Sequence, residues 1–188
     1  LIGANLEGAN LEAADLHGAK MLGADLSEAN LEDADLRGAY LTNAYLAVAK
    51  LNGADLEGAD LTCAGLYGAN LEGANLEGAA LTCADLSEAD LRGAKLMKAE
   101  LRLAKINEAF LNDAQFNEAS LRGAQFNGAQ FNNVNLCRAD LCRARLNGVS
   151  LTSAKLEDAR LVEVQLIGAD LSGLDLSNSW LRSTNMAG

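Results

Sequence analysis

Proline is absent from this sequence of 188 residues, and histidine and tryptophan occur only once each. Charged residues recur throughout the chain, so no apolar run reaches the length of a membrane-spanning helix. Aromatic residues make up 4% of the composition although apolar residues make up 49%. These absences argue against proline-rich linkers and against a core built on large aromatic anchors, and they predict a soluble protein without membrane insertion.

The usual signals of catalytic and metal sites are also missing. The four cysteines form no CxxC pair, and their spacing suits neither structural zinc nor a disulfide framework. The glycines recur at a fixed period rather than in a phosphate-binding loop, and His17 stands alone among acidic neighbours. We therefore expect a protein that is not an enzyme, needs no metal or cofactor and keeps four free thiols, which favours the cytoplasm. Leu1 enters in mid-repeat, as expected of a truncated or processed chain.

What the chain has in abundance is a repeat of five residues. At positions 1, 6, 11 and onward to 186 the residue is Leu in 32 of 38 cases, and Ala stands two residues earlier in 31 of 37. A helix would spread these leucines around its circumference, and a flat strand would send them alternately to both faces. A short Ala-Asp/Asn-Leu unit followed by a two-residue corner points Ala and Leu inward and the residue between them outward. Of the 18 glycines, 17 occupy the second corner position, where a turn often needs a positive φ.

The runs ANLEG at residues 4–8 and ADLEG at residues 54–58 resemble the repeats of the pentapeptide repeat family, and the resemblance covers essentially all 188 residues. It implies an all-β fold, a right-handed quadrilateral parallel β-helix (β-solenoid) with four pentapeptides per coil and about nine coils. We expect residues 1–188 to form a single domain. Within it, residues 171–188 are degenerate and predict a transition to a cap or to a homodimer contact at the C-terminal end.

Acidic residues concentrate in the first half of the chain. Residues 1–94 carry 16 acidic and 4 basic side chains, a net charge of −12, whereas residues 95–188 carry 10 and 11, a net charge of +1. Residues twenty apart stack in such a coil, so like charges lie about 4.8 Å apart and need water, cations or a basic partner. The candidate acidic surface consists of Glu12, Asp15, Glu32, Asp33, Asp35, Asp55, Glu57, Glu72 and Glu77.

The side built around Leu1, Met21 and Leu41 and continuing to Leu181 is the least polar on its outside. It combines aromatic and apolar side chains with arginines, a composition typical of protein interfaces. The candidate interaction face consists of Tyr40, Arg102, Leu103, Arg122, Arg143, Trp180 and Arg182.

The leading functional hypothesis is a non-catalytic structural or protein-interaction scaffold that presents flat, rigid faces to an unidentified protein partner. The resemblance implies an alternative, because some pentapeptide repeat proteins mimic B-form DNA in width and negative charge and protect DNA gyrase from quinolones. The acidic columns favour this gyrase/topoisomerase-binding alternative, and the basic second half disfavours it. A net charge of −11 disfavours nucleic acid as a partner, and a merely solvated surface is the plain alternative for the charged columns.

Overall fold

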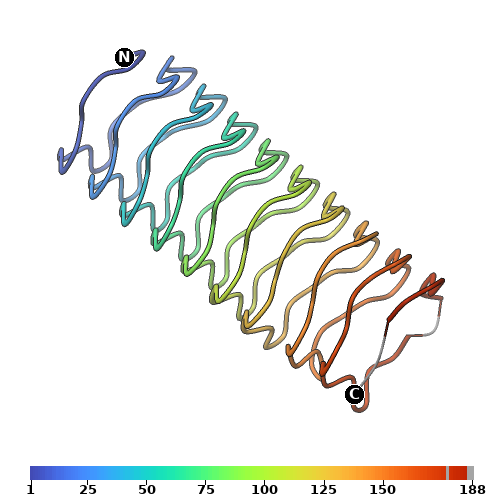
Figure 1. Cartoon of the computed structure of the whole chain (residues 1–188). Helices are drawn as coiled ribbons and strands as arrows, with labels where there is room; N and C mark the ends of the chain where they lie inside the picture. Colours follow the sequence, from blue (N-terminus) through green and yellow to red (C-terminus); the bar gives the residue numbers. More distant parts are fainter. Residues whose placement is uncertain (177, 186–188) are drawn as a thin grey trace.

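The computed structural model describes residues 1–176 and 178–185, which form a stack of similar coils running from the N-terminal to the C-terminal end (Figure 1). These residues form neither a helix nor an extended strand, because each side of a coil contributes one residue to an isolated parallel bridge. Every bridge joins residues that are twenty positions apart. The expected parallel β-helix with four five-residue sides per coil is therefore confirmed.

The bridge residues form four ladders along the stack. One ladder runs without interruption from Asn5 through Asp25 and Tyr45 to Asn185. Each bridge residue immediately precedes the inward position that leucine occupies in most repeats, so the Asp or Asn of the repeat faces outward between two inward side chains.

Backbone hydrogen bonds repeat from coil to coil. The N–H of Leu36 donates to the carbonyl of Asp55 at 2.7 Å, and the N–H of Gly38 donates to the carbonyl of Glu57 at 2.9 Å. In the opposite direction, the N–H of Asp55 donates to the carbonyl of Ala34 at 3.0 Å. Neighbouring coils are thus tied together on every side, which makes the stack stiff along its axis.

The corners share one backbone conformation whether or not they contain glycine. The N–H of Ala39 closes a corner by donating to the carbonyl of Leu36 at 3.0 Å. The second corner residue has a positive φ at Gly38 (60°) and equally at Val48 (58°). Among the described residues only Ser153 lacks a positive φ at this position, so stacking imposes the left-handed conformation on many residue types, and glycine adopts it with the least strain.

The interior is filled by the alanines and leucines that the repeat predicts. No polar or charged side chain is buried among residues 1–176 and 178–185. Phe116, Phe126 and Phe131 replace leucine in the core, and the ring centroids of Phe126 and Phe131 lie 5.3 Å apart in an edge-to-face arrangement. Burial of each large apolar side chain contributes about 2 kcal/mol, so the core supplies most of the stabilisation.

One irregularity accompanies the larger core residues. In the described chain the ladder that contains Gln130 is interrupted between Gln130 and Ser150. Close to this point the N–H of Asn133 donates to the hydroxyl of Ser153 at 3.0 Å. The interruption lies beside Phe131, where an aromatic ring fills a position that leucine occupies in most repeats.

The coil continues into the segment that the sequence marks as degenerate. Trp180 bridges Arg160, and the hydroxyls of Ser179 and Thr184 donate to the carbonyls of Leu156 at 2.9 Å and Leu161 at 3.0 Å. Residue 177 and residues 186–188 of this segment lie outside the described residues. Nowhere in the described chain is there a helix with the length and apolar character needed to cross a membrane.

Candidate functional site

The acidic surface covers two adjacent sides of the coils, because its nine members flank the leucines of the Leu11 and Leu16 columns. Asp15, Asp35 and Asp55 follow one another in a single bridge ladder, as predicted from their spacing. Asp15 is exposed, whereas Asp35 and Asp55 are half-buried. Among the other members, Glu32 is half-buried and Asp33 and Glu57 are exposed.

Arg37 partly neutralises this column. Its Nε donates to Asp35 Oδ1 at 2.8 Å and lies 3.8 Å from Asp55 Oδ2. Hydrogen bonds from the Arg37 side chain and backbone hold the pKa of Asp35 well below its ordinary value. The sequence analysis did not include Arg37, although its position two residues after Asp35 was the signal for this pair.

Basic residues also approach the neighbouring columns. Arg92 Nη2 lies 3.0 Å from Glu72 Oε2, and Lys98 Nζ lies 3.7 Å from Glu77 Oε1. Glu12 accepts a hydrogen bond from the side-chain amide of Asn30 at 3.2 Å. The acidic surface is therefore interrupted by cations of the same chain rather than uniformly negative.

The residues of the candidate interaction face are spread over the length of the stack. Tyr40, 51% exposed, lies near the N-terminal end, and Trp180, 70% exposed, lies near the C-terminal end beside Leu181. Arg182 is exposed in that same last part. The remaining four residues, Arg102, Leu103, Arg122 and Arg143, line one common hollow.

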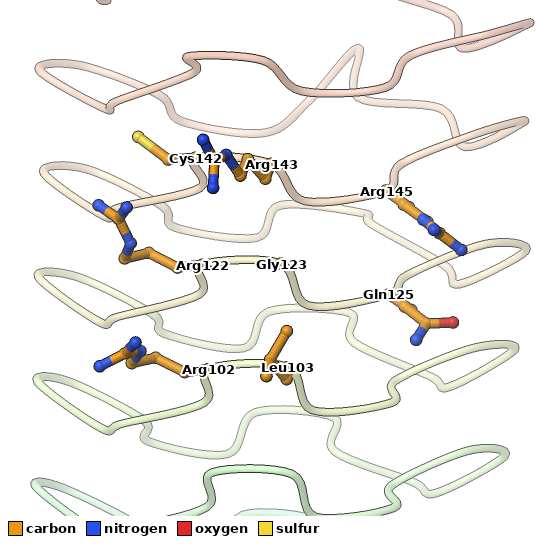
Figure 2. A pocket seen from close by; sticks show the side chains of 8 residues that line it. All are labelled: Arg102, Leu103, Arg122, Gly123, Gln125, Cys142, Arg143 and Arg145. Carbon is orange, nitrogen blue, oxygen red and sulfur yellow. The ribbon is translucent and has the colours of Figure 1, made fainter.

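This hollow, which we call the arginine hollow, has a volume of about 360 Å³ and spans three successive coils. In Figure 2 the side chains of Arg102 and Arg122 lie on one side of it, and those of Gln125 and Arg145 lie on the other. Between them Leu103 points toward Gly123. Its lining residues are Arg102, Leu103, Arg122, Gly123, Gln125, Cys142, Arg143 and Arg145.

Two of the four arginines in the hollow are paired with carboxylates. Arg122 Nη1 lies 3.2 Å from Asp140 Oδ2, and Arg143 Nε lies 2.8 Å from Glu163 Oε2. Partial burial opposes ionisation of Asp140, but hydrogen bonds from Cys142 and Arg122 hold the pKa of this carboxyl below its ordinary value. Within the described part of the chain, Arg102 and Arg145 have no ion-pair partner, so the hollow retains positive charge.

The cysteines are free. Cys63 and Cys83 are exposed, Cys137 is half-buried, and Cys142 is buried at the rim of the arginine hollow. Burial is the larger cause that raises the pKa of the Cys142 thiol, and the hydrogen bond with Asp140 raises it further, so this thiol is protonated at neutral pH. In the part of the chain that the structure describes, no three His, Cys, Asp or Glu side chains cluster as a metal site would require.

The predicted interaction face did not include four residues that line the hollow, Gly123, Gln125, Cys142 and Arg145. The signal for Gly123 was its place between Leu103 and Arg143, each twenty residues away, where a missing side chain leaves space. Arg145 stands in a bridge ladder directly above Gln125 and belongs to the adjacent side of the coil. A search confined to one side therefore overlooks it.

The comparisons with known proteins agree with this geometry. A family model described as pentapeptide repeats matches in eight copies, at residues 1–38, 24–62, 39–78, 59–97, 84–123, 99–136, 119–158 and 150–188. The solved structure of HetL, a pentapeptide repeat protein involved in heterocyst differentiation regulation in the cyanobacterium Nostoc sp. strain PCC 7120, is 33% identical over 99% of this chain and 90% of that one, with a TM-score of 0.48.

A trypsin-treated form of QnrB1, a plasmid-mediated fluoroquinolone resistance protein, superposes with a TM-score of 0.72. The alignment covers 99% of this chain and 88% of QnrB1 at 19% identity, which shows a shared fold alone. The comparison with curated proteins returned no match.

Proposed function

The chain belongs to the pentapeptide repeat family, and on that premise we propose that it is a non-catalytic scaffold whose flat, rigid sides bind a protein partner. One observation carries this proposal: among the described residues the whole interior is apolar, and every polar or charged side chain is at least partly exposed. General acid–base catalysis needs a desolvated group held in a cleft. A right-handed quadrilateral β-helix with such an interior offers its functional groups on its outer sides instead.

Rigidity supports a binding role. The ladder from Asn5 to Asn185 passes through every coil, and hydrogen bonds such as that of Leu36 with Asp55 hold each coil to the next. A surface that is already ordered loses little conformational entropy when a partner binds. The exposed Tyr40, Leu103 and Trp180 provide apolar contacts on the least polar side of the coils.

A second candidate function is binding to DNA gyrase or another topoisomerase as a mimic of DNA. The stacked carboxylates of Asp15, Asp35 and Asp55 favour it, since they place negative charge at a regular spacing. Arg37, Arg92 and Lys98 weaken this candidate, because they lie against members of the acidic surface. We therefore rank it below the scaffold.

We propose further that residues 1–188 act as one domain in the cytoplasm and that the C-terminal end makes a homodimer contact. Four free cysteines support a reducing compartment. Trp180 and Leu181, 70% and 40% exposed, are apolar groups suited to self-association. Sedimentation of the parent and of Trp180→Ser tests the contact, which predicts a dimer for the parent and a monomer for the variant.

The scaffold is tested by affinity capture from a lysate of the source organism. The parent is compared with an acid-neutralised variant and with an arginine-neutralised variant, both checked for unchanged thermal unfolding. The first carries Asp15→Asn, Asp35→Asn, Asp55→Asn, Glu57→Gln and Glu77→Gln. The second carries Arg102→Gln, Arg122→Gln and Arg143→Gln.

We expect the parent to retain one protein in a fixed ratio and the arginine-neutralised variant to lose it. Retention of gyrase by the parent, lost only in the acid-neutralised variant, would instead favour the DNA-mimic function. If all three proteins retain nothing in a fixed ratio, the scaffold proposal is wrong.

A further inference from the structure

We infer that the arginine hollow binds an acidic peptide segment, with an apolar residue between its carboxylates, from a protein partner. This inference rests on the proposed scaffold function and identifies the chemistry of one partner. Four arginines and one exposed leucine from three successive coils line a space of about 360 Å³ (Figure 2).

Charge is the first step. Arg122 and Arg143 share their charge with Asp140 and Glu163, whereas Arg102 and Arg145 have no ion-pair partner among the described residues. Guanidinium groups stay protonated at all physiological pH values and bind carboxylates through paired hydrogen bonds. The hollow therefore offers two uncompensated cations, on opposite sides of one space, within a protein whose net charge is −11.

Shape is the second step. Gly123 forms the floor of the hollow, because a Cβ built there would lie only 2.8 Å from Leu103 Cδ2. Leu103 is 59% exposed and leans over this floor, so one wall of the space is apolar. A ligand with an apolar side chain between two acidic ones covers Leu103 while its carboxylates reach Arg102 and Arg145.

Extent is the third step, and it favours a short peptide over a nucleic acid. The three coils that line the hollow span about 10 Å along the stack, since neighbouring coils lie about 4.8 Å apart. A duplex presents phosphates far beyond that length, along a protein whose net charge is −11. A short acidic segment places its charges only where the arginines are.

Calorimetric titration tests the inference with a capped pentapeptide in which four glutamates surround a central leucine. At low salt we expect it to bind the parent, and added salt to weaken binding. The same peptide with glutamine in place of glutamate should not bind. In the variant with Arg102→Gln and Arg145→Gln we expect affinity to fall at least about tenfold, the loss of one or two charge-assisted contacts.

A matched variant with Lys50→Gln and Lys95→Gln changes the net charge equally and should keep the affinity of the parent. Gly123→Glu should abolish binding by filling the hollow with a carboxylate. The backbone of the corner accepts this residue type, because Glu118 has a φ of 62° at the equivalent position, and the end of the Leu103 side chain must shift to make room for the new Cβ. Gly78→Glu is its control, since Gly78 has a φ of 65° and open space around it.

Three results would overturn the inference. The first is no binding of the acidic peptide to the parent at millimolar concentration, and the second is equal binding of the glutamine peptide. The third is arginine-dependent binding of inorganic phosphate or duplex DNA without binding of the peptide. The capture experiment above separates this failure from failure of the scaffold. A partner retained by both the parent and the arginine-neutralised variant leaves the scaffold standing and removes the hollow as its binding site.

Discussion

At the scale of single residues, the second corner position shows how far the stack overrides local preference. Val48 has a φ of 58° there, although a β-branched side chain is poorly suited to the left-handed region. Its side chain is 55% exposed, so packing contacts offset little of the backbone strain. The hydrogen bond from the Val48 N–H to the Tyr67 carbonyl, at 2.9 Å, holds the residue in this conformation. At such positions a residue with a side chain makes the protein less stable than glycine would.

Replacing Val48 with glycine should therefore stabilise the protein. We expect Val48→Gly to raise the free energy of unfolding by about 0.5–1 kcal/mol, since relief of left-handed strain exceeds the added entropy of the unfolded chain. Urea unfolding monitored by circular dichroism measures the difference. Tyr45→Gly is the matched control and should destabilise, because Tyr45 stands in a bridge ladder. A lower midpoint for Val48→Gly than for the parent would refute strain at this corner.

At the scale of the five-residue element, the Asp or Asn before the core leucine has a structural role that its charge conceals. Its side-chain oxygen accepts a hydrogen bond from the N–H two residues later, as Asp35 does from Arg37 at 3.1 Å and Asn75 does from Glu77 at 3.2 Å. This bond ties the side to the following corner. Asp and Asn make the same bond, which explains why the repeat accepts either residue type.

The side-chain hydrogen bonds between Arg37 and Asp35 give the protein a dependence on acid that we can predict in sign. The pKa of Asp35 is lowered in the folded protein by its hydrogen bonds with Arg37, so its contribution to stability is complete above the unfolded pKa, about 3.9, and is lost progressively as pH falls from there through the folded pKa. We expect Asp35→Asn to be less stable than the parent at pH 7, and the difference to be smaller at pH 3. Urea midpoints at both pH values measure this convergence.

Glu28→Gln is the matched control, because Glu28 is an exposed carboxylate without an ion pair or side-chain hydrogen bond in the described chain. It should leave the pH dependence of the parent unchanged. A constant difference between the parent and Asp35→Asn from pH 7 to pH 3 would contradict the proposed role of ionised Asp35.

At the scale of the whole molecule, stability is a sum over neighbouring coils. Every bridge joins residues twenty apart, so each coil contacts only the one before it and the one after it. The acidic first half and the arginine hollow of the second half consequently lie on one continuous stack of coils and share its core. Each such surface is formed by residues of neighbouring coils, so its composition depends on which coils are adjacent.

Removing one whole coil should preserve this frame. Deletion of residues 61–80 joins Asp60 to Leu81 and keeps every column in phase. We expect this protein to fold with an unchanged circular dichroism signal per residue and to lose about 2 kcal/mol of unfolding free energy, the share of twenty residues. Deletion of residues 61–78, two residues shorter, should abolish cooperative unfolding because leucines leave their column. Equal midpoints for the two deletions would rule out stacking in register.

The period of Leu and Ala determined by itself the five-residue side and its inward residues, because burial of regularly spaced apolar groups depends on position along the chain alone. The family resemblance implied four sides per coil, and with them the stacking of Asp15, Asp35 and Asp55. Only the tertiary structure decided that Arg37 contacts both Asp35 and Asp55, that Val48 adopts a positive φ, and that Arg102 and Arg145 lie on opposite sides of one hollow. Long side chains choose their partners by rotamer and by contact across corners, and the one-dimensional repeat specifies neither.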